Sequence, residues 1–171
     1  MKLIGLVGRA EAGKTTIANH LVEHFGYART AFADPLKKML ITAGLCTHDE
    51  CYKKKTEQSR FLLQRIGTEI FRKQIDPLFW VDRCEQEIYR LGQQKPVVVD
   101  DIRFPEEARR IRDLGGVLVK VERVGHNAAT GTDHDSESQV DGIATDFTIR
   151  AESGDVQKIY LCIEEIIGER L

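Results

Sequence analysis

The chain has 171 residues, of which 42% are hydrophobic and 30% charged, a balance typical of a globular domain and unlike that of a disordered chain. Its formal net charge of -2 at pH 7 argues against nucleic acid as the main partner, although a local basic cluster can still hold a small polyanion. No apolar run reaches the length of a membrane span, and the scattered cysteines predict reduced thiols in a cytosol-like compartment.

The N-terminal part of the chain alternates between strand and helix patterns. Residues 3–7 are apolar throughout, which predicts a strand covered on both faces rather than a signal peptide. Helical periodicity follows over 15–25, and a short strand is expected over 29–33. Asp34-Pro35 then predicts the start of a helix, with Asp34 as its cap, and Gly44 predicts its end.

The middle of the chain reads as two helices and a strand. Residues 57–75 form one long helical pattern, and Asp76-Pro77 predicts the start of another helix that continues to Leu91. Between these helices and the first part of the chain, the stretch Cys46–Cys51 carries metal-capable side chains, but its spacing is not a usual zinc pattern and favours a polar loop. A second buried strand over 96–99 ends at Asp100-Asp101.

The C-terminal part completes an alternating pattern. Its expected elements are a helix over 105–114, a strand over 117–121, a strand over 146–149 and an amphipathic helix over 156–167. Residues 124–142 are polar and without periodicity, which predicts a long exposed loop of the kind that forms lids and binding loops. The alternation predicts one α/β domain over 1–171, with a mainly parallel sheet flanked by helices in three layers.

The turn after the first strand matches a phosphate-binding motif. Gly8 to Thr15 reads G-x-x-x-x-G-K-T between an expected strand and an expected helix, the context in which successive backbone N–H groups cradle phosphates. Lys14 supplies a charge for the β- and γ-phosphates of ATP, and Thr15 supplies a hydroxyl for Mg²⁺; an accidental glycine-rich turn is the alternative. The expected ATP-binding residues are Gly8, Ala10, Glu11, Ala12, Gly13, Lys14, Thr15 and Thr16.

A pair of carboxylates follows the buried strand over 96–99. The carboxyl end of a strand in an open parallel sheet is where ligands bind, so Asp100 or Asp101 is expected to serve Mg²⁺ near the phosphate loop. Arg103 is close enough in sequence to reach a phosphate. The alternative is that these aspartates only cap the turn that follows, and the pattern leaves open which of the two meets the metal.

The chain resembles the deoxynucleoside monophosphate kinases of bacteriophages, within the wider P-loop nucleoside monophosphate kinase fold. The resemblance rests on motifs that keep their order from residue 3 to about 150, and its most specific parts are the Gln-x-x-Gly-Thr-Glu-x-x-x-Arg and Asp-x-Arg-Phe-Pro stretches. The matching segments are Gly8–Thr16, Phe32–Lys37, Leu63–Arg72, Phe79–Val81, Val99–Ala108, Gly115-Gly116 and His134–Glu137.

The resemblance implies a three-layer P-loop NTPase-type core that binds ATP and Mg²⁺, a helical acceptor-binding segment over about 34–92, and a lid over about 123–142. It implies that Asp101 and Arg103 lie at the transfer centre, with Asp101 and Thr15 toward the metal and Arg123 with Lys14 as further catalytic groups. The acceptor-side residues would be Asp34, Lys37, Arg65, Thr68, Glu69, Arg72 and Trp80, and those of the lid His134, Ser136 and Glu137.

Several of these residues have a plain structural alternative. Asp34 fits equally as a helix cap, Trp80 as a core residue, and Arg65 as part of a charged helix face in which Glu69 pairs with Arg65 or Lys73.

The predicted activity is ATP-dependent phosphoryl transfer to a deoxynucleoside 5'-monophosphate, giving the diphosphate. The alternatives are a kinase of a hydroxymethylated base in DNA or of another small phosphorylated metabolite, a nucleotide-binding regulator without transfer activity, and an ATPase module that uses hydrolysis for motion. The expected partners are small nucleotides, with a homodimer as a further option. The expected location is the cytoplasm, or the host cytoplasm if the chain is viral.

Overall fold

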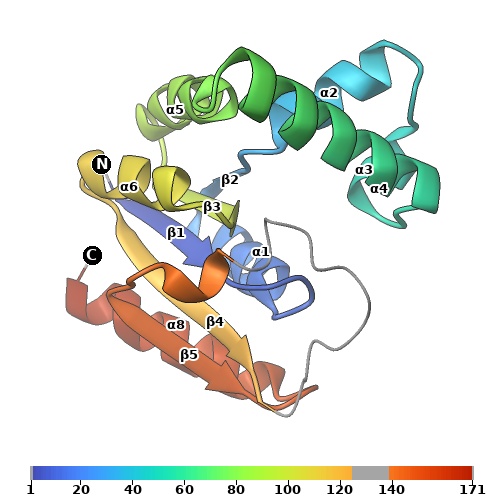
Figure 1. Ribbon diagram of the computed structural model, residues 1–171. Coiled ribbons are helices and arrows are strands. Elements are labelled where there is room, and N and C mark those ends of the chain that lie inside the picture. The colour runs from blue at the N-terminus through green and yellow to red at the C-terminus, as the bar shows by residue number, and fades with distance from the viewer. Residues whose placement is uncertain (1, 125–138, 171) are drawn as a thin grey trace. The chain divides into compact units, whose positions relative to one another are not determined.

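The computed structural model describes residues 2–124 and 139–170 and divides them into two compact units (Figure 1). One unit comprises Met1–Ala31 with Ile88–Leu171, and the other comprises Phe32–Glu87. The predicted lid residues His134, Ser136 and Glu137 lie outside the described residues.

The first unit is built on a five-stranded sheet in which every pairing is parallel. The strand order is β2-β3-β1-β4-β5, so β1 lies at the centre between β3 and β4. The strands are β1 (Leu3–Val7), β2 (Ala28–Thr30), β3 (Val97–Ile102), β4 (Val117–Arg123) and β5 (Phe147–Ala151). The prediction of a mainly parallel sheet is therefore confirmed, and β2 is shorter than the expected 29–33.

Helices cover both faces of this sheet, which explains why its central strands are apolar throughout (Figure 1). On one face, α1 (Lys14–Phe25) and α8 (Val156–Arg170) share a core with the strands, through residues such as Ile17, Val119 and Ile163. On the other face, α6 (Pro105–Asp113) packs on β1 and β4. A side chain at Gly5 would meet Ile111 of α6 at 3.1 Å, so glycine permits this close approach. The expected three-layer α/β architecture is confirmed.

The register between β1 and β3 shifts where the two aspartates lie. Gly5 pairs with Val99, but Val7 pairs with Ile102, so Asp100 and Asp101 together face a single residue of β1. Such a bulge disrupts the strict alternation of side chains and often re-aims a residue beside an active site.

The second unit is helical, with α2 (Asp34–Thr42), α3 (His48–Tyr52), α4 (Glu57–Gln64) and the start of α5 (Phe79–Gly92). Thr47 and Thr56 each form a capping box at the start of α3 and α4, which fixes where these helices begin. Two expectations are wrong here. Within the stretch 46–51, residues from His48 onward belong to α3, and Cys51 in this helix and Cys46 before it are both buried, so the stretch is not a polar loop. Ala33, not Asp34, is the cap residue of α2.

The expected long helix over 57–75 changes type half-way. Residues Arg65–Ile75 form a π-helix, called η1, that follows α4 directly. Gly67 supplies the physical reason: its carbonyl accepts a 3.0 Å hydrogen bond from the indole nitrogen of Trp80, and a side chain on it would lie 2.6 Å from Leu36. A partner that engages a helix carbonyl in this way competes with the regular i→i−4 pattern. The prediction of one α-helix over 57–75 is therefore wrong for its second half.

Trp80 anchors the core of the helical unit. It is 4% exposed, stacks at an angle on Phe71, and packs with Leu36 and Leu40. These contacts agree with the structural alternative for Trp80, because its ring is buried in side chains of its own unit.

We expect Trp80→Phe to lower the free energy of unfolding by about 1 to 3 kcal/mol, because the buried Gly67 carbonyl loses its indole donor. Urea denaturation measures this loss. Tyr89→Phe, which changes a half-exposed aromatic side chain, is the control and should match the unchanged protein. An unchanged stability of Trp80→Phe would show that the indole hydrogen bond does not stabilise the unit.

Among the described residues, no helix combines the length and apolar character needed to cross a membrane.

Candidate functional site

The phosphate loop leaves β1 at Gly8 and enters α1 at Lys14 through a tightly curved backbone. A side chain at Gly8 would lie 2.6 Å from the Val121 carbonyl oxygen, so only glycine allows the loop to pass this close to β4. Gly13 has a φ of 106°, a conformation that glycine adopts without strain. Glu11 also has a positive φ, of 61°, which is uncommon for a residue with a side chain and is found preferentially at functional sites.

Lys14 is held by the loop that precedes it. Its side chain is buried, with 7% exposed, and its ammonium donates hydrogen bonds to the carbonyl oxygens of Gly8 and Arg9 at 2.5 and 2.6 Å. The positive charge is thus fixed across the loop at the N-terminus of α1, where the helix dipole also favours an anion.

Asp100 meets the phosphate loop directly. Its carboxylate is 5% exposed, and its Oδ2 accepts a 3.3 Å hydrogen bond from the hydroxyl of Thr15. Asp101 is half-buried at the next position. The structure thus brings the Asp100 carboxylate together with Thr15, the residue that follows Lys14.

Arg29 completes this cluster, and the sequence reasoning missed it. Its guanidinium donates to Asp100 Oδ2 at 2.7 Å and to Asn19 Oδ1 at 3.1 Å. Arg29 lies on β2, the short edge strand, and is not part of any recognisable sequence motif. The only available signal was the need of a buried carboxylate for a positive partner.

Arg103 and Phe104 follow β3 on a backbone that Glu107 holds in place. Glu107 is 2% exposed, and its Oε2 accepts hydrogen bonds from the N–H groups of Arg103 at 2.9 Å and Phe104 at 3.2 Å. The half-buried Arg103 therefore starts from a fixed backbone position at the end of β3.

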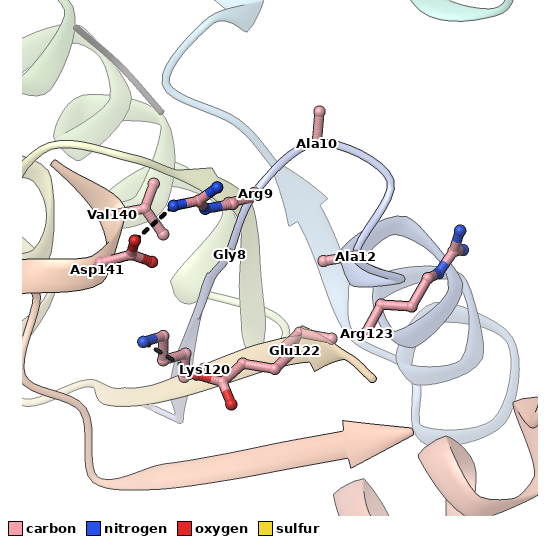
Figure 2. A pocket seen from close by; sticks show the side chains of 10 residues that line it. Gly8, Arg9, Ala10, Ala12, Lys120, Glu122, Arg123, Val140 and Asp141 are labelled. Carbon is pink, nitrogen blue, oxygen red and sulfur yellow. Dashed lines mark hydrogen bonds and ion pairs between the residues drawn. The ribbon is translucent and has the colours of Figure 1, made fainter. Parts of the chain in front are cut away.

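A pocket of about 250 Å³ lies beside the loop, between its first half and the end of β4 (Figure 2). Arg123, expected at the base of the lid, lines this pocket together with Ala10 and Ala12 of the loop. On the opposite side, Arg9 forms a 2.5 Å ion pair with Asp141, which links the loop to the 3-10 turn η2 (Val140–Gly142).

The β4 side of this pocket carries the carboxylate of Glu122 between two basic side chains. Arg150 and Lys120 donate to the Glu122 carboxylate at 2.6 and 3.0 Å, and these hydrogen bonds hold the pKa of Glu122 below its usual value. Glu122 thus stays ionised near neutral pH, and the pocket wall presents both signs of charge to a polar ligand.

The expected acceptor residues lie in the helical unit, and the structure groups some of them. Asp34 and Lys37 form an ion pair at 3.5 Å, and the Lys37 ammonium also lies 4.5 Å from the centre of the Tyr52 ring. On η1, Glu69 pairs with Lys73 at 2.9 Å, one of the two partners considered for it. Arg65 is exposed, whereas Thr68 and Arg72 are half-buried on the same helix.

Arg65 and Arg72 are seven residues apart on η1. Seven residues bring two side chains back to one face of an α-helix, but a π-helix with i→i+5 bonds has more residues per turn, so its geometry turns these two arginines to different faces.

Within the described ranges, no three His, Cys, Asp or Glu side chains gather to hold a metal ion. Burial raises the pKa of the Cys46 thiol, and the nearby Cys51 adds to this shift, which disfavours the thiolate that zinc requires.

Comparison with known proteins gives matches over most of the chain. Residues 47–162 match the family described as deoxynucleotide monophosphate kinase. A protein of Acanthamoeba polyphaga mimivirus described as a deoxynucleotide monophosphate kinase is 30% identical over 183 aligned residues, which cover 94% of this chain and 93% of that protein. The deoxynucleoside-5'-monophosphate kinase of Escherichia phage T5 is 31% identical over 86 residues, covering 47% of this chain and 34% of that protein.

Solved structures share the fold at low sequence identity. Dephospho-CoA kinase from Campylobacter jejuni superimposes with a TM-score of 0.58 at 15% identity, covering 100% of both chains. Shikimate kinase from Aquifex aeolicus superimposes with a TM-score of 0.50 at 15% identity, covering 99% of both chains. At this identity the likeness shows a common architecture and says nothing of the acceptor.

Proposed function

Because the chain belongs to the deoxynucleotide monophosphate kinase family, we propose that it transfers the γ-phosphoryl group of ATP to a deoxynucleoside 5'-monophosphate. The observation that carries this proposal is the cluster of Lys14, Thr15 and Asp100 at the end of β1 and β3. A phosphate-binding lysine, a hydroxyl and a buried carboxylate are the groups that phosphoryl transfer from ATP requires.

The residues present fit a Mg²⁺ ion. Thr15 Oγ1 and Asp100 Oδ2 are hard oxygen donors 3.3 Å apart, and Mg²⁺ in kinases is commonly held by one or two such groups together with substrate phosphates. When bound, the ion would neutralise negative charge on the transferred phosphoryl group. We assign the metal role to Asp100 rather than to the expected Asp101, because the contacts with Thr15 belong to Asp100.

The remaining groups act by position and charge. Successive N–H groups from Gly8 to Thr15 orient the phosphates of ATP, and Lys14 neutralises the charge that develops on them during transfer. Arg103 and Arg123 are proposed to add positive charge from the ends of β3 and β4. Because phosphoryl transfer passes through a loose transition state, no strong general base is required.

The pocket beside the loop is proposed to receive the sugar or base of ATP. It begins at Gly8 and Ala12, where the phosphates would lie, and extends to Arg123 and Glu122 on β4. Its mixed charges suit the hydroxyl and ring nitrogen atoms of a nucleoside.

The acceptor is proposed to bind the helical unit through its basic side chains. Lys37 and Arg72 are partly buried, and a π-helix such as η1, which carries Arg72, is frequently found at functional sites. Asp34, Arg65, Thr68 and Glu69 remain candidates in the same unit, whereas Trp80 is assigned to its core. The predicted homodimer and cytoplasmic location, the host's if the chain is viral, stay predictions.

A coupled assay of ADP release tests the proposed function. With ATP and Mg²⁺, we expect at least one of dAMP, dGMP, dCMP and dTMP to accelerate ADP release well above the rate without acceptor, and above that with the matching ribonucleotide. ATP binding without ADP formation on any monophosphate would contradict the proposal and favour a regulator. Activity confined to a DNA oligonucleotide with hydroxymethylated bases would instead identify a DNA base kinase.

A further inference from the structure

We propose that Arg29 is a positioning residue that holds the Asp100 carboxylate against Thr15 and so strengthens the binding of the metal–nucleotide complex. This inference rests on the proposed function and assigns a role to a residue outside the matched motifs. It depends on three observations: the register of β2 on β3, the burial of Asp100, and the separate anchoring of Arg29.

The register brings Arg29 and Asp100 to the same face of the sheet. Arg29 pairs with Val98 in the parallel β2–β3 ladder, and Asp100 lies two residues beyond Val98 on the same strand. Val98 belongs to the same core cluster as Ile17 of α1, and Asp100 accepts a hydrogen bond from Thr15 of that helix. Both side chains therefore lie on the face that α1 covers, although the register against β1 shifts between Val99 and Ile102. The 2.7 Å ion pair is thus a diagonal contact that the strand pairing builds.

Burial makes the charge of Asp100 dependent on this partner. The Asp100 side chain is 5% exposed, whereas that of Arg29 is 38% exposed, so the arginine delivers a positive charge from the edge strand to a carboxylate removed from water. Breaking such a pair from the arginine side leaves a buried charge without that compensation. Without Arg29, one of the hydrogen bonds that hold the Asp100 carboxylate in the orientation facing Thr15 is lost.

Asn19 makes the arrangement directional. Arg29 donates through Nη1 to Asn19 Oδ1 and through Nη2 to Asp100 Oδ2, so the two ends of one planar guanidinium are fixed by different elements. Asn19 belongs to α1, the helix that begins with Lys14 and Thr15. The fork therefore ties the end of β3 to the helix that carries the phosphate loop.

The same oxygen of Asp100 accepts hydrogen bonds from both Arg29 and Thr15. Arg29 can therefore have one of two opposite effects on metal binding: it can compete with the metal for this oxygen, or it can orient the carboxylate toward the metal. A guanidinium that competes with the metal for Asp100 would weaken metal binding, and its removal would strengthen it. A guanidinium that orients the carboxylate has the reverse effect. The independent anchoring of Arg29 by Asn19 favours orientation, because the guanidinium is held in place without relying on Asp100.

The test measures metal binding without turnover. Mn²⁺ binding to the 171-residue chain in the presence of ADP is followed by electron paramagnetic resonance for the unchanged protein, Arg29→Ala and Arg29→Lys. Partners that orient a metal ligand typically contribute about 10- to 100-fold in affinity, so we expect the Mn²⁺ dissociation constant of Arg29→Ala to rise by about tenfold or more. Arg29→Lys keeps the charge but not the fork, and we expect a smaller rise.

Two controls separate positioning from damage to the fold. Arg109→Ala removes a guanidinium from an exposed ion pair with Asp113 and should leave Mn²⁺ binding unchanged. ADP affinity measured in EDTA should be equal in Arg29→Ala and the unchanged protein, because the phosphate loop itself is intact. If Arg29→Ala does not fold, the rise expected for Arg29→Lys carries the test.

Equal or tighter Mn²⁺ binding by the folded Arg29 variants would overturn the role of Arg29 while leaving the proposed function in place. Failure of the unchanged protein to bind Mn²⁺ together with ADP would overturn both.

Discussion

Lys14→Ala is expected to abolish measurable phosphoryl transfer while the protein stays folded. The structure fixes the Lys14 ammonium by two hydrogen bonds to the loop's own carbonyl oxygens, so its removal takes away the charge that we propose neutralises the transferred phosphoryl group. Loss of one such preorganised group typically lowers kcat by about 10²- to 10³-fold. ADP release with ATP, Mg²⁺ and the best deoxynucleotide acceptor measures the effect.

The control for Lys14→Ala is Lys158→Ala, which removes an exposed lysine from α8. It should match the unchanged protein in both activity and unfolding temperature. Circular dichroism should show the same helix content for Lys14→Ala, since its side chain supports no part of the described core clusters. Near-normal turnover by Lys14→Ala would contradict the mechanism.

The second large effect concerns the two neighbouring aspartates. We expect Asp100→Asn to lower kcat/KM by about a hundredfold or more and to raise the Mg²⁺ concentration needed for half-maximal activity, because a metal ion contributes several kcal/mol of charge stabilisation. Asp101→Asn should have a clearly smaller effect, since the contact with Thr15 belongs to Asp100. Titration of activity with Mg²⁺ for both variants gives the comparison.

The aspartate pair is its own matched control, because the two substitutions make the same chemical change at adjacent positions. A larger loss in Asp101→Asn would return the metal role to Asp101, as the family resemblance implied. Equal and small losses would remove both aspartates from the metal site.

The sequence predicted the sheet and the loop because both depend on local patterns. Five apolar or short strand patterns alternate with helices, and this periodicity alone implies a parallel sheet covered on both faces. The loop is defined by glycines at positions where a side chain would not fit, as at Gly8, which approaches β4 closely. The comparisons confirm the family and the fold that these patterns indicated.

The choice between Asp100 and Asp101 could not be made from the sequence. A regular strand would place them on opposite faces, but nothing in the pattern says which face carries the loop, and the register shift against β1 alters the alternation at this point. Arg29 was missed for a related reason. Its contact with Asp100 depends on strand order, since β2 pairs with β3 although nearly seventy residues separate them along the chain.

The helical unit was predicted less well because its details depend on tertiary contacts. The π-helix η1 contains no sequence motif for its type, and the contacts of Gly67 with Trp80 and Leu36 arise only once the helices are packed. The short helix α3 has a polar composition that resembles a loop, yet Cys51 within it and Cys46 before it lie in the core of the helical unit. Its capping box, Thr47 with Glu50, is the signal in the sequence that marks the start of this helix.

The central claim is that the turn from β1 to α1 binds the phosphates of ATP opposite a carboxylate of β3. A crystal structure with Mg²⁺ and a non-hydrolysable ATP analogue tests it most directly. The account predicts β- and γ-phosphate oxygens within hydrogen-bond distance of the N–H groups of Gly13, Lys14 and Thr15, with the metal next to Thr15 and Asp100. An analogue bound elsewhere, or phosphates turned away from Lys14, would contradict it.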